Sequence, residues 1–270
     1  MYGLKTGSER AAKLWPKWIK TMKAFMTANA VKPEQFMIEL FDEPGDMEEV
    51  TRVVSAAHEA WPDLRNLLTL DSRQGKKGAD YKYRVKAPVM RRMSDAVDTW
   101  ILHRNYYFSD PEHLAFYKEI QEKGKKVGHY TCETNPTSQL HGNYRLTGWF
   151  GECYHLDSNH IYQLVEGIGY NGGVDFATAT AGNLLLIAGF RGEVIPTIRS
   201  MALRQGIMDV KYLALLRKIA GNSAEAKQFL ETAARRVVID QRFNSQAPDA
   251  VREEAVQLIL KLQAKNQGMP

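Results

Sequence analysis

The sequence predicts an α/β protein of parallel βα units, of the (β/α)8 barrel type. Apolar strands and amphipathic helices alternate from about residue 36 to residue 179, which is the pattern of a parallel sheet covered by helices. Polar side chains follow the strands at their carboxyl ends, where barrel active sites lie. No early strand is followed by a glycine-rich turn, which argues against the alternative, an open doubly wound sheet that binds a nucleotide.

About five βα units can be assigned in chain order, after a helix from Ser8 to about Ala30 that contains Pro16. The predicted strands cover residues 36–41, 67–70, 99–102, 126–132 and 174–179. The predicted helices between them cover residues 47–60, 89–97, 111–123 and 161–169. Three terminal helices follow at residues 198–220, 224–239 and 251–264.

Five strands cannot close an eight-stranded barrel. The pattern therefore predicts that residues 1–220 form the carboxyl-terminal part of a barrel and that residues 221–270 form a helical extension packed on it. An upstream domain or a partner chain would then complete the barrel and cover the exposed edge of the first strand.

Composition excludes several classes of protein. The chain has 270 residues, of which 44% are hydrophobic and 25% charged, as in an ordinary soluble globule. The formal charge of +5 is spread along helices, so nucleic acid is not an expected partner. The longest apolar run is far below the roughly 20 residues of a membrane span. The first nine residues do not resemble a signal peptide, which leaves a cytoplasmic, a processed and a fragmentary chain as alternatives.

Neither the cysteines nor the histidines predict a metal site. Cys132 and Cys153 are 21 residues apart, a spacing that matches no zinc motif, and they are interpreted as buried thiols, with a disulfide between them as the alternative. The histidines show no spacing typical of metal ligands.

The adjacent carboxylates Asp42 and Glu43 are the most informative pair in the sequence, because they directly follow an apolar strand and precede Pro44. Neighbouring carboxylates repel each other, so one can hold a proton as a general acid while the other stays ionised. Successive strand residues point to opposite faces, so both reach one cleft only where the strand ends and turns. The competing interpretation is that one of them caps the next helix.

Other strand-end residues are candidates for substrate binding. His103 and Asn105 can donate hydrogen bonds to hydroxyl groups, and Glu133 follows the fourth strand. The aromatic candidates for stacking on a sugar are Trp100, Tyr106, Tyr107, Tyr130 and Trp149, of which Trp100 is the one expected to be core. Arg204 and Asp209 are expected to belong to a structural ion-pair network.

Three stretches of the sequence carry a family resemblance. They are Phe41-Asp42-Glu43-Pro44; Tyr130-Thr131-Cys132 with Pro136, Arg145 and Trp149; and Pro196-Thr197-Ile198-Arg199 followed by the 203–213 segment, which contains Gly206 and Asp209. Together they resemble the catalytic domain of glycoside hydrolase family 123, which contains β-N-acetylgalactosaminidases. The resemblance spans most of residues 36–216.

The resemblance implies retaining hydrolysis of a terminal β-linked N-acetylhexosamine, preferably N-acetylgalactosamine, with the acetamido oxygen of the sugar as nucleophile. Asp42 would then orient the acetamido group, and Glu43 would act as general acid and base. The implied partner is a carbohydrate substrate, and no metal or organic cofactor is required.

One departure from the family leaves a second function open. Relatives carry a tryptophan on the eighth strand, but the corresponding stretch here runs from Gly173 to Ala179 without one and contains Asp175. Asp175 either binds a sugar hydroxyl or is an exposed polar residue at the strand start. The alternative function is therefore a non-catalytic barrel remnant that binds glycans or has a structural role.

Overall fold

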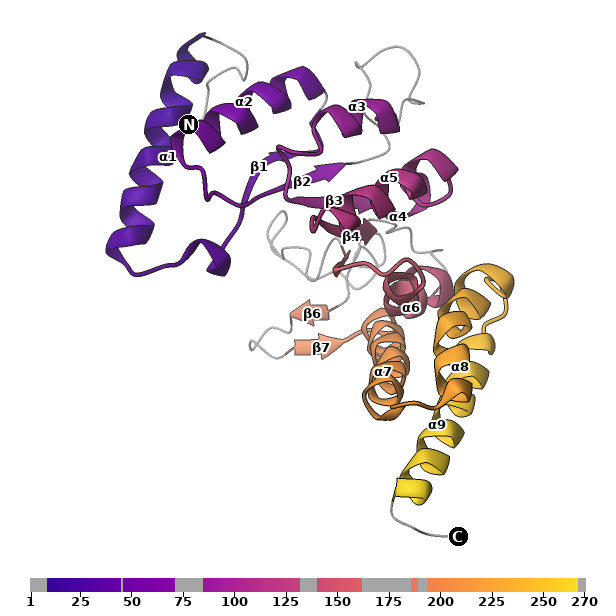
Figure 1. Cartoon of the computed structure of the whole chain (residues 1–270). Coiled ribbons are helices and arrows are strands. Elements are labelled where there is room, and N and C mark those ends of the chain that lie inside the picture. The colour runs from indigo at the N-terminus through magenta and orange to yellow at the C-terminus, as the bar shows by residue number, and fades with distance from the viewer. Residues whose placement is uncertain are drawn as a thin grey trace. The chain divides into compact units, whose positions relative to one another are not determined.

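The computed structural model describes residues 9–44, 46–70, 85–131, 140–161, 186–188 and 194–266. The protein has an α/β fold in which parallel strands alternate with helices, and the strand order of its main sheet is β1-β2-β3-β4-β5 (Figure 1). The chain divides into two compact units, Met1–Tyr130 and Thr131–Pro270. The predicted α/β class and the parallel sheet are thereby confirmed.

The first unit contains four strands of this sheet and the helices that connect them. The strands are β1 (Ile38–Asp42), β2 (Asn66–Leu70), β3 (Thr99–His103) and β4 (Lys126–Thr131). The helices are α1 (Glu9–Ala28), the 3-10 turn η1 (Pro33–Gln35), α2 (Met47–Ala60), α3 (Ala87–Arg92), α4 (Arg104–Tyr107) and α5 (Pro111–Glu122). Each strand pairs in parallel with the one that precedes it in the sequence.

The sheet of the first unit has one face that is covered by helices. Ile38 of β1 packs against a cluster that contains Ala57 of α2 and Trp61, the residue after this helix, and α2 in turn packs against α1. Further along the sheet, Trp100 of β3 is fully buried and its ring meets Phe116 of α5 edge to face at 5.4 Å. Trp100 is therefore a core residue, as its position inside the strand predicts.

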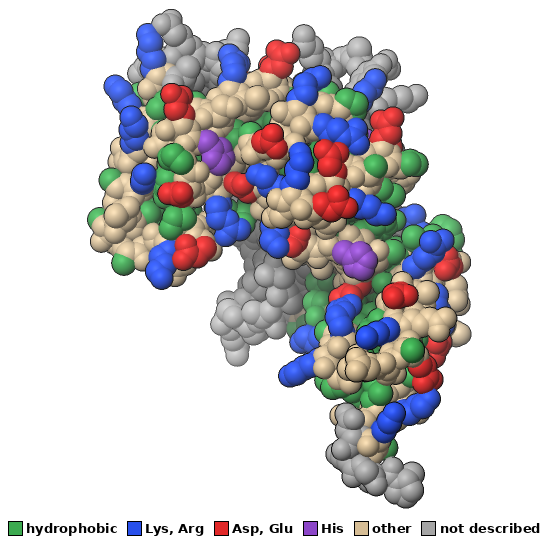
Figure 2. Space-filling model, viewed as in Figure 1, with side chains coloured by type: hydrophobic (Ala, Val, Ile, Leu, Met, Phe, Trp, Pro, Cys, Tyr) green, Lys and Arg blue, Asp and Glu red, His purple; other side chains and the backbone are tan. Residues whose placement is uncertain are grey.

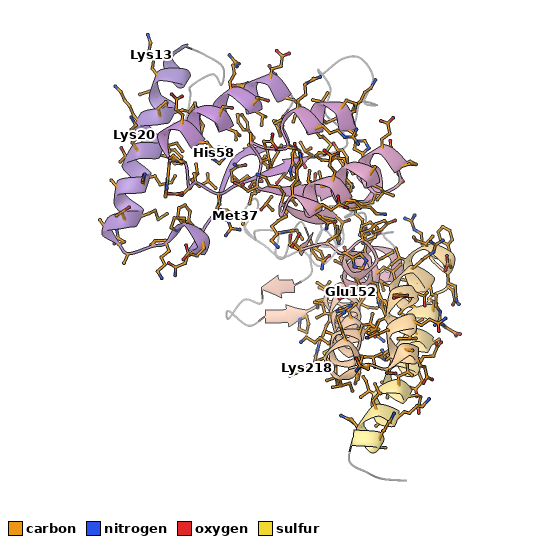
Figure 3. All side chains as sticks on the ribbon, viewed as in Figure 1. Lys13, Lys20, Met37, His58, Glu152 and Lys218 are labelled. Carbon is orange, nitrogen blue, oxygen red and sulfur yellow. The ribbon has the colours of Figure 1, made fainter. Side chains whose placement is uncertain are left out.

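A polar cluster lies at the amino ends of the strands, on the opposite edge from the predicted site. The backbone N–H of Asn66 donates to Asp98 Oδ2 at 3.0 Å, and its side-chain amide donates to the carbonyl oxygen of Ala96 at 2.8 Å. His58 of α2 reaches the same amide at 2.8 Å (Figure 3), and Lys125 donates to Asp98 Oδ1 at 3.1 Å. These contacts join α2 to the starts of three strands and satisfy polar groups that are largely buried.

The second unit is mainly helical. It contains a π-helix (His141–Arg145), α6 (Leu146–Cys153), β5 (Ser158–Ile161), the antiparallel pair β6 (Leu186–Ala188) and β7 (Val194–Pro196), α7 (Ile198–Ile219), α8 (Ala224–Arg235), a second π-helix (Arg236–Asp240) and α9 (Ala247–Asn266). Its core includes Trp149, Leu213, Leu216, Val237, Val251 and Ile259. The helices after residue 220 therefore share one hydrophobic core with α6 and α7.

Gly206 permits the close approach of α7 to the first π-helix. A Cβ atom at this position would lie 1.9 Å from the carbonyl oxygen of Arg145. Because that oxygen belongs to the backbone, no side-chain rotation could relieve the clash. A glycine is thus needed at the helix crossing.

The element predictions fail mainly after β4. Residue 161 was expected to begin a helix, but Ile161 ends β5; the rest of the predicted helix at 161–169 lies outside the described residues, as does the predicted strand at 174–179. The short α4 and α6 and the π-helices are not in the prediction. Within the described part of the chain, none of the helices combines the length and the apolar character needed to cross a membrane.

Candidate active site

The candidate site lies on the face of the sheet that points away from α5, at the carboxyl ends of the strands in the first unit. Trp100 points toward α5, so strand alternation directs Ile101 of the same strand to the other face and His103 with it. The parallel register extends this face across the sheet, because Asp42 pairs with Thr69, Thr69 with Ile101, and His103 with Tyr130. We call this surface the site face.

The backbone turn at Glu43 brings both carboxylates to the site face. Glu43 has a φ of +46°, a left-handed conformation that a non-glycine residue adopts at an energetic cost. Its N–H donates to the carbonyl oxygen of Thr69 at 3.1 Å. This turn interrupts the alternation of the strand, so the side chain of Glu43 does not continue to the face opposite Asp42.

The capping interpretation of the acidic pair is wrong. The N-cap of α2 is Asp46, whose carboxylate accepts hydrogen bonds from the N–H groups of Glu48 at 2.9 Å and Glu49 at 3.1 Å. Asp46 thereby supplies the oxygen that the first turn of the helix requires. Asp42 and Glu43 are left for another role.

A hydrogen bond connects Glu43 with the far strand of the first unit. The hydroxyl of Tyr130, on β4, donates to Glu43 Oε1. The ring of Tyr130 packs edge to face on His103, with 5.0 Å between ring centroids. Tyr130 is 6% exposed and His103 is 3% exposed, so the rings that support the carboxylate are held in packed surroundings.

The same hydrogen bond reports on the curvature of the sheet. Two strands lie between β1 and β4, and a flat sheet would hold the outer strands about 14 Å apart at the usual spacing of neighbouring strands. The side chains of a flat sheet also stand parallel to one another. Since Glu43 and Tyr130 meet, the sheet curls toward the site face at its carboxyl edge.

Thr69 and Glu39 also belong to the site face, although neither was predicted as a site residue. The hydroxyl of Thr69 donates to Glu39 Oε1, and Thr69 is the register neighbour of Asp42. Thr69 is the one hydroxyl side chain in the otherwise apolar end of β2, Leu67-Leu68-Thr69-Leu70. That interruption of an apolar strand is the signal that could have identified it.

The structure brings together four of the residues predicted for the site: Asp42, Glu43, His103 and Tyr130. Asn105 and Tyr106 lie in α4, directly after β3, but their side chains are outside the described residues. Glu133 and Asp175 are also outside the described residues. Tyr107 is fully buried, and its ring meets His113 at 5.1 Å, which makes it a packing residue.

The expected sugar-stacking role of Trp149 does not fit its position. Trp149 is fully buried in the core of the second unit, so neither ring face is accessible to a ligand. Its indole N–H donates to Asp209 Oδ2 at 3.2 Å. Trp149 thus orients a buried carboxylate and packs the core.

Asp209 lies at the centre of a buried ion-pair network. Its carboxylate accepts from Arg145 Nε at 3.1 Å and from Arg252. Arg145 also forms a two-bond pair with Asp249 at 2.8 and 2.7 Å. The prediction of a structural network at Asp209 is confirmed, but its partners come from the first π-helix and α9, whereas Arg204 is exposed. Hydrogen bonds from Arg145 lower the pKa of Asp249.

Two hollows lie away from the acidic pair. One, of about 490 Å³, lies in the second unit and includes Glu152, Asn159 and Arg217 in its lining. The other, of about 310 Å³, lies between α2 and α3. No group of residues within the described ranges has the composition of a metal site. Cys153 is a free thiol whose pKa is raised to about 11 by burial, and Cys132 lies outside the described residues.

No family model and no curated protein matches this chain.

Proposed function

We propose that the chain is the catalytic part of a retaining glycoside hydrolase that acts on terminal β-linked N-acetylhexosamine. The observation that carries the proposal is the left-handed turn at Glu43, which directs its carboxylate to Tyr130 on the site face, where Asp42 also lies. Strained backbone conformations cluster at active sites, and glycoside hydrolysis uses a pair of carboxyl groups.

The proposed architecture is a segment of a (β/α)8 barrel. Sequential strand order is the order of such a barrel, whereas a doubly wound sheet reverses direction at a switch point. The curl of the sheet toward the site face supports the same interpretation, because this face would be the barrel interior.

The two carboxylates would have different tasks in a substrate-assisted reaction. Asp42 would hold the N–H of the acetamido group while the acetamido oxygen attacks the anomeric carbon and the bond to the leaving group breaks. Glu43 would donate its proton to the departing oxygen and would then remove a proton from the water that opens the oxazoline intermediate. Adjacent residues can serve the acetamido group on C2 and the leaving oxygen on C1, which are neighbours on the sugar ring, because the turn at Glu43 places both carboxylates on the site face.

Chromogenic N-acetyl-β-galactosaminides and N-acetyl-β-glucosaminides test the proposal directly. Asp42→Asn is expected to lower the rate about 100-fold or more. Glu43→Gln is expected to impair substrates with poor leaving groups most, because good leaving groups need little protonation. Asp63→Asn, an exposed carboxylate near the amino end of β2, serves as the matched control and should retain full activity.

Two results would contradict this function. Equal cleavage of glycosides that lack the acetamido group would exclude assistance by the substrate. Binding of N-acetylgalactosamine in a calorimetric titration, without hydrolysis of any glycoside by the same preparation, would favour the alternative of a non-catalytic glycan-binding protein.

A further inference from the structure

The second unit exposes apolar side chains along one helix. On α7, Met201 is 63% exposed, Met208 is 42% exposed and Leu215 is 41% exposed. They recur every seven residues, and because two turns of an α-helix take about 7.2 residues they form one narrow line. We call this line the α7 stripe. The buried side of the same helix contains Leu213 and Leu216, so the stripe is not required for the core.

A row of basic residues runs beside the α7 stripe at the same spacing. Arg204, Lys211 and Lys218 are exposed and follow one another every seven residues. Figure 3 shows Lys218 on the side of α7 that points away from α8 and α9. The ion pairs recorded within the described ranges include none of the three. The only acidic residue of α7 is Asp209, which is fully buried.

We propose that the exposed side of α7 is a docking surface for an amphipathic, acidic α-helix of a partner protein. The α7 stripe supplies one apolar position per heptad, with Ile198 exposed beside its first residue, and a single partner helix can cover such a line. Methionine side chains are flexible and polarizable, so Met201 and Met208 can adapt to the side chains of such a partner. Glutamate or aspartate beside the partner's seam would face Arg204, Lys211 and Lys218.

Charge and shape argue against other occupants of this surface. A second copy of the chain offers no exposed carboxylate on α7, so symmetric pairing would leave both basic rows without counter-charge. A lipid surface is contacted best by a broad apolar face with aromatic side chains, whereas the exposed apolar residues of α7, which also include Ile198 and Ile207, contain no aromatic ring. Basic and acidic side chains are interspersed on the face of the first unit seen in Figure 2, unlike the uniform row on α7.

A synthetic three-heptad helix with leucine in its seam and glutamate on its flanks is a suitable probe. Binding to the 270-residue chain is measured by fluorescence anisotropy at low and high salt. The acidic helix is expected to bind, with an affinity that falls as the salt concentration rises. A version with lysine in place of glutamate should not bind. Met208→Glu should raise the Kd at least about tenfold, since it places a charge in the apolar seam. Lys211→Glu should raise it about fivefold.

The controls use matched residues outside the α7 stripe. Leu260→Glu changes an exposed apolar residue on α9, and Lys227→Glu changes an exposed base on α8; both should leave the Kd unchanged. Failure of the acidic helix to bind overturns the proposal. If the chain bound vesicles of phosphatidylserine and phosphatidylcholine and Met208→Glu abolished this binding, the proposal would be overturned in favour of a lipid surface. If the chain sedimented as a dimer that Met208→Glu dissociated, it would be overturned in favour of a second copy.

Discussion

Replacing Tyr130 with phenylalanine removes the hydroxyl that donates to Glu43 and leaves the ring in place. The edge-to-face contact with His103, at 5.0 Å between ring centroids, involves the ring and not the hydroxyl, so the packing should persist. The substitution therefore isolates one hydrogen bond. If the geometry of the site is as described, Glu43 will lose the partner that fixes its direction on the site face.

The size of the effect follows from the surroundings of this bond. As the proposed general acid, Glu43 holds a proton before the reaction, and a hydrogen bond between neutral groups contributes about 0.5–1.5 kcal/mol. The low exposure of Tyr130 (6%) limits competition from water on the donor side, but the Glu43 side chain is exposed. We therefore take about 1 kcal/mol, which corresponds to about a fivefold decrease in the population of the directed carboxyl group. The expected fall in kcat/KM on the chromogenic glycoside is of the same size.

A double-mutant cycle tests the contact without relying on the proposed activity. The free energy of unfolding in urea is measured for the wild type, Tyr130→Phe, Glu43→Ala and the double variant, because alanine removes the acceptor whereas glutamine would keep one. We expect a coupling energy of about 1 kcal/mol, and Tyr212→Phe with Glu43→Ala as the control pair should be additive. Additivity of Tyr130→Phe and Glu43→Ala within about 0.3 kcal/mol would refute the contact. Full activity of Tyr130→Phe, with the coupling present, would show that the contact is structural and not needed for catalysis.

Further predictions concern the supports of the two units. Gly206→Ala should destabilise the second unit by about 3 kcal/mol or more because of the clash with Arg145. The control, Gly124→Ala, has open space around the new Cβ atom but a φ of +77°, and should cost about 1 kcal/mol. Equal midpoints of unfolding in urea for the two variants would contradict this prediction. Asn66→Ala should cost about 1–3 kcal/mol, since it removes the buried amide that donates to the carbonyl oxygen of Ala96 and contacts His58, and exposed Asn29→Ala should cost far less. The pKa of Asp249 is lowered in the folded protein. The ionised carboxylate therefore stabilises the fold at a pH above the pKa that Asp249 has in the unfolded chain, and this stabilisation is lost as the pH falls below about 4. In urea titrations from pH 3 to 7, Asp249→Asn should reduce this loss of stability at low pH, whereas the control Asp240→Asn should not. If the stability of Asp249→Asn fell at low pH as steeply as that of the wild type, Asp249 would be excluded as the cause.

Local sequence patterns were sufficient for much of the first unit. The predicted helix at residues 47–60 has the bounds of α2, because a strong N-cap and a following Trp61-Pro62 are local signals. After β4 local patterns were insufficient. The stretch from Ser158 to Ile161 has no strand periodicity of its own, so its strand conformation depends on tertiary context that local patterns do not contain.

The motif residues of the second unit show the same limit. Arg145, Trp149, Gly206 and Asp209 were recognised as parts of a family-like pattern, and the structure shows that they contact one another as a packing and ion-pair unit. Sequence spacing could not reveal this, since Arg145 and Asp209 are 64 residues apart. The tertiary fold assigned Trp149 to a core and not to a sugar site.

The acidic pair shows most clearly what each level of structure decides. The sequence by itself determined that two carboxylates follow an apolar strand and that both can serve one cleft only if the chain turns there, because strand side chains alternate. The tertiary structure decided that the chain turns at Glu43 and that the carboxylate of this residue contacts Tyr130. Glu43 takes the left-handed conformation because its N–H finds Thr69 and its carboxylate finds Tyr130. These partners are distant in sequence and become neighbours only when the strands pair and the sheet curls.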